Sequence, residues 1–193
     1  MVPVALEVFE TCTTDGIQLL FRGFIIISMR IVNSTDASIG LPEVDEHWMQ
    51  YAQQLAAKAE AQGEVPVGAV LVKNGEVVGE GWNQPITLSD PTAHAEIMAM
   101  RAAGQLLENY RQPDTTLYVT LEPCSMCAGA MLHARVGRVV FGAYDPKTGA
   151  AGSVYDMLQD ERNLHKLTVD GGVLAESCSE QLRSFFRGKR KKA

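Results

Sequence analysis

The sequence is poor in the features that mark secreted, membrane-spanning and broadly nucleic-acid-binding proteins. Its 193 residues include only 4 cysteines, too few for a disulfide framework, so we expect a reducing, cytoplasmic environment. The formal net charge of −6 argues against binding nucleic acid through the overall field, and we expect no DNA partner. The most apolar run, residues 19–29, is interrupted by Arg22 and is too short to span a bilayer, so we expect no membrane association.

The first part of the chain carries no recognisable motif. We interpret residues 1–43 as an amino-terminal extension that is disordered, or as a sign that translation starts at Met29 or a later codon. Residues 33–40 have the Ser, Asp and Gly content of a linker. The hydrophobic content of 46% suffices for one core. We therefore expect one catalytic domain over residues 44–188 and a basic tail over residues 189–193.

Two short motifs suggest a metal site. His94 is followed two residues later by Glu96, and Cys124 and Cys127 form a Cys-x-x-Cys pair after Pro123. One imidazole and two thiols give a single zinc ion three protein ligands, which leaves the fourth tetrahedral position for water, as in catalytic sites. Glu96 is placed to reach such a water without ligating the metal, so it can carry protons.

Other interpretations of the cysteine pair must be weighed. A lone Cys-x-x-Cys is also typical of a redox pair or of half a structural zinc site. Cys12 and Cys178 stand alone in the sequence and do not supply a second such pair. A strand over residues 116–121 would suit a redox pair, which keeps that alternative open. The upstream His-x-Glu favours catalytic zinc.

Local signals place both motifs at helix starts. Asp90 and Pro91 are typical of an N-cap and first helical residue, which would put His94 and Glu96 in the opening turns of a helix ending near Gly104. Pro123 precedes a helix over residues 124–134 in the same way. The strand–helix–strand unit over residues 116–143 should be parallel and right-handed, with the metal at the strands' carboxyl ends.

The remaining elements follow from periodicity and turn residues. Asn74 and Gly75 form the strongest short hairpin signal and should join two antiparallel strands. We expect helices over residues 45–63, 154–164 and 176–187, strands over residues 67–72, 76–82, 116–121, 136–143 and 167–174, and loops over residues 83–89 and 145–152.

Two further stretches could contact a substrate. Asp145 and Lys147 lie in a turn-rich loop on the expected metal side of the sheet, although a solvated turn explains them nearly as well. The basic run over residues 187–192 is most often a solvated terminus. Beside Phe185 and Phe186, however, it has the combination of charge and aromatic rings that binds RNA backbone and bases.

The two metal motifs together match the signature of the zinc-dependent cytidine and nucleotide deaminases. Over about residues 44–188, the chain more specifically resembles the bacterial tRNA-specific adenosine deaminases of that superfamily. The stretches that carry this resemblance are residues 65–70, 81–83, 90–96, 139–143, 147–153 and 185–187.

The resemblance implies a three-layer α/β/α cytidine-deaminase-like fold, with a mixed five-stranded sheet flanked by helices. It implies a homodimer with one zinc ion per subunit that hydrolytically deaminates adenosine to inosine at the wobble position, 34, of a tRNA anticodon loop. Carried over by matching motif, the zinc ligands are His94, Cys124 and Cys127, the proton shuttle is Glu96, the base contacts are Asn83 and Ala95, and the contacts to flanking nucleotides are Phe186 and Arg187.

Two alternatives remain at this point. A deaminase of a free base or nucleotide, such as guanine, cytosine or dCMP, would carry the same zinc ligands and Glu96. A non-catalytic zinc or RNA-binding module would carry the ligands without needing Glu96. Asn83 and the aromatic-basic carboxyl terminus favour a polynucleotide substrate.

Overall fold

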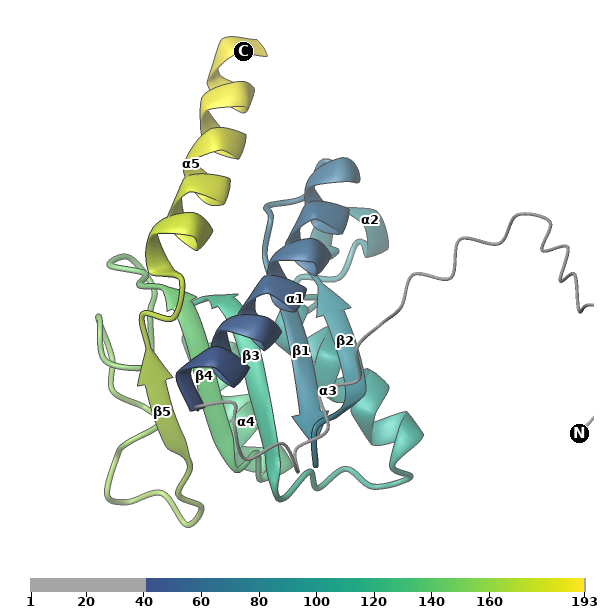
Figure 1. Ribbon diagram of the computed structural model, residues 1–193, viewed down its shortest axis with the longest axis vertical. Helices are drawn as coiled ribbons and strands as arrows, with labels where there is room; N and C mark the ends of the chain where they lie inside the picture. The colour runs from purple at the N-terminus through teal and green to yellow at the C-terminus, as the bar shows by residue number, and fades with distance from the viewer. Residues whose placement is uncertain (1–40, 193) are drawn as a thin grey trace, which may run out of the picture. The chain divides into compact units, whose positions relative to one another are not determined.

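The computed structural model describes residues 41–192. Of the expected extension over residues 1–43, residues 1–40 lie outside this range, and residues 41–43 belong to the first helix. The centre of the structure is one five-stranded sheet in the order β2-β1-β3-β4-β5 (Figure 1). β1 pairs antiparallel with both β2 and β3, whereas β3, β4 and β5 are parallel. The strands are β1 (Gly68–Lys73), β2 (Glu76–Trp82), β3 (Thr115–Leu121), β4 (Arg138–Ala143) and β5 (Thr168–Gly171).

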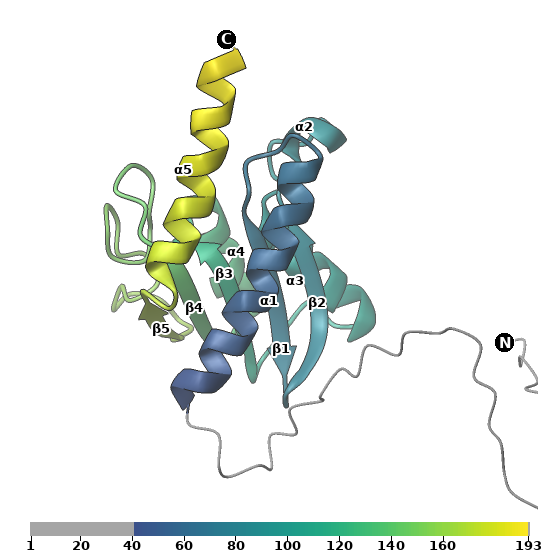
Figure 2. The same ribbon diagram turned by 45° about the horizontal axis from the view of Figure 1, so that its top comes forward.

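Helices cover both faces of this sheet. α1 and α5 lie on one face, and α3 and α4 lie on the other (Figures 1 and 2). The predicted fold class, a mixed five-stranded sheet between helical layers, is therefore confirmed. The helices are α1 (Leu41–Ala61), α2 (Pro85–Leu88), α3 (Ala95–Leu106), α4 (Ser125–Ala134) and α5 (Ala175–Lys192).

Successive side chains of β1 point to opposite faces of the sheet and pack into two separate hydrophobic cores. Ala69 and Leu71 pack toward α3 and α4, whereas Val70 and Val72 pack toward α1. A strand buried on both faces needs apolar residues at every position rather than at alternate ones, which explains the unbroken apolar run. Gly81 on β2 allows the close approach of α3, because a Cβ there would lie 2.1 Å from the carbonyl oxygen of Ala95.

The hairpin and the parallel unit form as predicted. Asn74 and Gly75 both have positive φ, 53° and 78°, the conformation that a tight hairpin turn requires at its two central residues. β3, α4 and β4 form the strand–helix–strand unit, and β3 and β4 are parallel. The starts of α3 and α4 therefore lie near the carboxyl-terminal edge of the parallel strands, where open α/β sheets bind ligands.

The predicted helix over residues 154–164 is wrong, because that segment is irregular. Asp160 accepts hydrogen bonds from the backbone N–H and the guanidinium of Arg162, and Asn163 donates its side-chain amide to the carbonyl of Met157. Such local side-chain bonds to the backbone compete with helical ones. The strand predicted over residues 167–174 is also shorter, and only residues 168–171 pair with β4.

Two helices are longer than periodicity suggests, and one was missed. α1 begins at Leu41 rather than Asp45, and α5 continues through the basic run to Lys192. α2 is a single short turn inside the expected loop over residues 83–89, with Pro85 at its first position. Within residues 41–192, no helix combines the length and apolar character needed to cross a membrane.

Candidate active site

The three predicted zinc ligands converge. The Nδ1 atom of His94 lies 3.7 Å from Sγ of Cys124 and 3.6 Å from Sγ of Cys127, and the ligand atoms of all three residues lie within 4.8 Å of one another. Tetrahedral zinc with ordinary bond lengths would separate its nitrogen and sulfur ligands by about 3.6 Å. The three side chains thus fit a zinc ion, with Nδ1 as the histidine ligand.

Helix starts hold these ligands, but not quite as predicted. Asp90 does not cap α3; its carboxylate accepts the backbone N–H and the hydroxyl of Thr92 in a preceding turn. α3 starts at Ala95, and His94 is its N-cap residue with extended backbone. Cys124 is likewise the N-cap residue of α4, and Cys127 lies one turn inside. The electropositive ends of both helices therefore face the ligand cluster and favour thiolates there.

The ligand cluster favours the metal-binding state of Cys124. A hydrogen bond from the Cys127 thiol, together with the His94 ring, lowers the pKa of Cys124 to about 4. The same contact with Cys124 raises the pKa of the His94 ring. The thiolate is the form of cysteine that ligates metals. Cys124 is half-buried and Cys127 is fully buried, so the cluster opens to solvent on the side of Cys124.

Glu96 is buried beside the ligands. Its side chain is only 4% exposed, and burial raises the pKa of its carboxyl. It follows His94 by two residues in the first turn of α3, and its carboxylate contacts the Cys127 thiol. Burial disfavours the ionised form of a carboxyl group, so Glu96 takes up a proton more readily than an exposed glutamate does. The structure thus places Glu96 where a proton carrier for the site would lie.

Asn83 and Ala95 meet at the same edge. Asn83 follows β2, and its side-chain oxygen accepts a hydrogen bond from the backbone N–H of Ala95 at 3.0 Å. This contact depends on the close packing of α3 against β2 at Gly81. It fixes the orientation of the amide, because only the oxygen can accept from an N–H. The Asn83 NH₂ group is left as a donor.

Glu122 is a site residue to which the sequence analysis gave no role. It is 2% exposed, and its carboxylate accepts the backbone N–H groups of Asp145 at 2.9 Å and of Ala151 and Ser153 at 3.0 Å. The Ser153 hydroxyl also donates to it. Glu122 therefore ties the loop over residues 145–153 to the strand end next to Cys124. The only sequence signal was a carboxylate directly before Pro123, flanking the cysteine motif.

The loop residues Asp145 and Lys147 differ in how they are engaged. The Asp145 carboxylate accepts the backbone N–H of Lys147 at 2.9 Å and the hydroxyl of Thr148 at 2.6 Å. These bonds are those of a local turn, which was the alternative to a substrate contact for this residue. The Lys147 side chain is exposed. A β-bridge between Cys124 and Gly149 brings this loop against the ligand cluster. Both residues thus lie near the site, but Asp145 already has partners.

The aromatic and basic residues of α5 lie on a helix. Phe185 and Phe186 pack edge to face at 5.4 Å, and Phe186 is 44% exposed. Lys189 lies over the Phe185 ring and donates to the carbonyl of Gly63, just after α1. Arg187 forms an ion pair with Glu180. α5 extends beyond the sheet past the carboxyl end of β5 (Figure 1).

Residues 42–143 match the family model described as the cytidine and deoxycytidylate deaminase zinc-binding region. This span contains all three zinc ligands and Glu96, and it covers more than half of the chain. The chain belongs to this deaminase family. His94, Cys124 and Cys127 are therefore its zinc-binding triad.

Within this family, the chain is similar to proteins described as tRNA-specific adenosine deaminases. The chain is 56% identical over 156 residues to a tRNA-specific adenosine deaminase of Haemophilus influenzae, a match that covers 80% of this chain and 90% of that one. It is 49% identical over 148 residues to a protein of the same description in Bacillus subtilis, covering 77% and 92%. A solved structure from work on A-to-I editing by tRNA:A34 deaminases at the wobble position superposes with a TM-score of 0.68 at 42% identity, covering 70% and 99%.

Proposed function

We propose that this protein hydrolytically deaminates adenosine to inosine at the wobble position of tRNA. The observation that carries the proposal is the triad of His94, Cys124 and Cys127 with the buried Glu96 beside it, in a chain 56% identical to a tRNA-specific adenosine deaminase. Zinc, when bound, supplies an activated water as the nucleophile.

Glu96 provides the proton transfers of the reaction. It accepts a proton from the attacking water and donates that proton to N1 of the adenine ring. It then accepts the proton of the hydroxyl group added at C6 and donates it to the departing amine, so that water and adenosine give inosine and ammonia. Its burial supports this role, because burial raises the pKa of the Glu96 carboxyl and so makes it easier to protonate than an exposed glutamate.

Asn83 and Ala95 bind the base in this proposal. The free NH₂ group of Asn83 offers a hydrogen-bond donor to a ring nitrogen of adenine, and its oxygen is held by the Ala95 N–H. The reacting base must leave the stacked loop to reach the buried Glu96, at a cost of a few kcal/mol that contacts to flanking nucleotides must offset. We assign these contacts to Phe186, through stacking, and to Arg187 and Lys147, through charge. Asp145 shapes the loop beside them.

Inosine formation in defined RNAs tests the function. We expect conversion of A34 in a tRNA anticodon stem-loop, and no comparable turnover of free adenosine, cytidine, dCMP or guanine. The matched control is the same stem-loop with G34. Turnover of a free base or nucleotide with an inert stem-loop would show that the chain acts on small molecules instead. Zinc at one equivalent with no turnover of any substrate would support a non-catalytic module.

We also propose a homodimer, supported by an apolar groove between α3 and α4. The groove has a volume of about 570 Å³ and is lined by apolar residues that include Ile97, Met100, Met126 and Ala130. The buried side-chain oxygen of Gln112, which lines the groove, has no hydrogen-bond partner within residues 41–192. A second copy would cover this surface. Light scattering should give twice the mass of one chain.

Charge at the groove should break the dimer. We expect Met126→Glu to run as a monomer, because it buries an unpaired charge in the interface. Ile86→Glu is the matched control, since Ile86 is a 75% exposed apolar residue on α2 that does not line the groove. A wild-type monomer, or a Met126→Glu dimer, would refute this interface.

We further propose that residues 44–188 suffice as the deaminase domain and that the protein acts in the cytoplasm, where tRNA is available. All the site residues named above lie between residues 83 and 187. Removing residues 1–40, which keeps α1 whole, should leave deamination of the stem-loop unchanged. Lost activity in that shortened protein would assign the first forty residues a role.

A further inference from the structure

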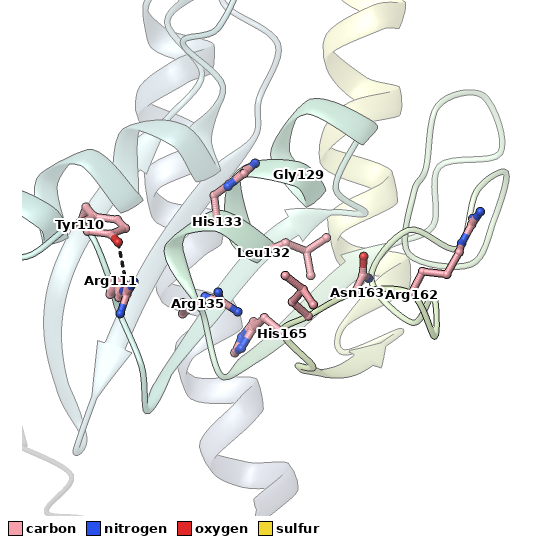
Figure 3. Close-up of a pocket in the computed structure, with 10 residues that line it drawn as sticks. Tyr110, Arg111, Gly129, Leu132, His133, Arg135, Arg162, Asn163 and His165 are labelled. Carbon is pink, nitrogen blue, oxygen red and sulfur yellow. Dashed lines mark hydrogen bonds between the residues drawn. The ribbon is translucent and has the colours of Figure 1, made fainter.

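A second concave surface lies away from the zinc site, and it is basic in an otherwise acidic protein. Its volume is about 380 Å³, and no Asp or Glu is among the residues that line it. Figure 3 shows it at the end of α4, between the segment after α3 and the loop that precedes β5. The charged and titratable residues of this basic pocket are Arg111, His133, Arg135, Arg162 and His165.

Arg111 and Arg135 form no ion pair with any residue in the range 41–192, and among the other described arginines only Arg190, which lies on α5 outside the pocket, shares this property. Arg101, Arg138, Arg162, Arg183 and Arg187 each form an ion pair. Figure 3 also shows Arg162 directed outward from the pocket, in keeping with its ion pair to Asp160. Arg111 instead donates to the hydroxyl of Tyr110 at 2.8 Å and packs against that ring. Two guanidinium groups in the pocket are thus without a counter-charge among the described residues.

Structural roles account for only part of this arrangement. Arg135 caps the carboxyl end of α4, where a cation is favoured by the helix dipole. The backbone of Arg135 is in the left-handed region, at φ 62°, where Gly or Asn would have a lower conformational energy. The dipole also does not explain Arg111, which belongs to another segment. Two guanidinium groups without a counter-charge in the described part of the chain leave the pocket open to an anionic partner.

The two histidines extend the same chemistry. Nε2 of His165 lies 2.6 Å from the carbonyl of Val136, so this nitrogen is the donor, which fixes the ring at the pocket wall. His133 is exposed on the last turn of α4. Tyr110 and His133 also line the apolar groove proposed as the dimer interface, so the basic pocket adjoins that interface.

From these contacts we propose that the basic pocket is a binding site for the phosphodiester backbone of the RNA substrate, with Arg111 and Arg135 as the phosphate ligands. This rests on the proposed function. Guanidinium groups bind phosphate oxygens in bidentate fashion, and the acidic remainder of the chain needs such a local site to hold RNA. Arg135 lies about 16 Å from Cys124 along the axis of α4, so a phosphate at Arg135 belongs to a different nucleotide from the one that reacts at the zinc site of the same subunit.

The test measures RNA affinity without turnover. In a Glu96→Ala background, binding of the unreacted A34 stem-loop is followed over a range of salt concentrations for three proteins. They are the parent, Arg111→Ala/Arg135→Asn, and the control Lys58→Ala/Lys73→Ala, which removes the same charge from residues that do not line the pocket. Asn suits the left-handed backbone at position 135.

We expect the pocket variant to bind RNA roughly tenfold more weakly, and its plot of log affinity against log salt to be shallower by about two. The control should differ from the parent by much less. With Glu96 restored, the pocket variant should keep the parent's rate at saturating RNA. Equal affinities and slopes for the pocket variant and the control would overturn the proposal.

Imidazole NMR signals separate RNA from small anions. Stem-loop RNA should shift the signals of His133 and His165 and leave that of His47, on α1, unchanged. Inorganic phosphate and AMP serve as the small-anion probes. If they shift these signals at low concentration while RNA does not, the pocket takes a free phosphate and the RNA assignment is wrong. Because none of these binding measurements needs turnover, their failure is distinct from failure to deaminate A34.

Discussion

The side-chain oxygen of Asn83 accepts the backbone N–H of Ala95 at 3.0 Å, which links the end of β2 to the first turn of α3. His94, the residue before Ala95, is a zinc ligand, so this contact lies at the edge of the zinc site. The contact fixes which end of the Asn83 amide faces outward.

Replacing Asn83 by Asp separates the two roles of this side chain. Asp keeps the acceptor for Ala95 but loses the NH₂ donor, so we expect the fold and zinc content to persist. Deamination of the stem-loop should fall by roughly 10- to 100-fold, the cost of leaving one buried hydrogen bond unmade. Single-turnover rates and thermal melting measure both effects. A melting temperature lowered in step with activity would point to a structural role alone.

Replacing Glu96 by Gln tests the proton carrier. Gln keeps the size and burial of the side chain but cannot take up a proton, so we expect turnover to drop by about 100- to 10,000-fold, the usual contribution of general acid–base catalysis. Zinc measured by elemental analysis should stay at one equivalent per chain. Gln105→Glu, at the far end of α3, is the control. It changes a residue of the same helix away from the site, so turnover should stay at the parent level. Near-normal turnover in Glu96→Gln would remove Glu96 from the mechanism.

The sequence was sufficient for the parts of this fold that short local patterns encode. Asn74 and Gly75 specified the hairpin because few other residues accept two consecutive positive φ angles. The zinc triad was recoverable because a metal demands particular atoms, and His94, Cys124 and Cys127 are the residues that supply them.

Features that depend on contacts distant in sequence were not predictable. Glu122 becomes a loop anchor only because the chain returns at residues 145–153 to present three N–H groups to it. The unpaired state of Arg111 and Arg135 likewise appears only once α4 and the segment after α3 are brought together. Periodicity also favoured a helix over residues 154–164, which the side-chain bonds of Asp160 and Asn163 replace by an irregular path.

Removing zinc should abolish deamination and lower the melting temperature, because the ion binds the folded triad and so stabilises it. Chelator treatment followed by added zinc should restore both. Cys124→Ser and Cys127→Ser should each hold less than one equivalent of zinc. Cys178→Ala is the control, since Cys178 is buried on α5 away from the triad and should keep full zinc content. Equal zinc loss in that control would mean that global instability, not ligand loss, explains the result.

Replacing Phe186 by Ala should weaken RNA binding more than chemistry. The ring is 44% exposed beside Phe185, and stacking on a base contributes about 1–3 kcal/mol. We therefore expect a 5- to 100-fold loss in affinity for the stem-loop, in line with that energy, and an unchanged single-turnover rate at saturating RNA. Leu106→Ala controls for loss of an exposed apolar side chain, because Leu106 is 64% exposed and does not line the basic pocket. A collapsed rate with unchanged affinity would place Phe186 in the chemistry instead.

Replacing Glu122 by Gln should loosen the loop over residues 145–153. One of its two oxygens becomes an NH₂ group that faces backbone N–H donors, which leaves at least one buried hydrogen bond unmade and costs about 1–3 kcal/mol of unfolding free energy. Because Lys147 lies in this loop, the stem-loop KM should rise while zinc stays bound. Gly149→Ala should act in the same direction, since a Cβ there would lie 2.4 Å from the Glu122 side chain. Gly188→Ala, where a Cβ meets nothing within 4 Å, is the control. If denaturant unfolding and KM are normal in both loop variants, the carboxylate does not hold the loop in place.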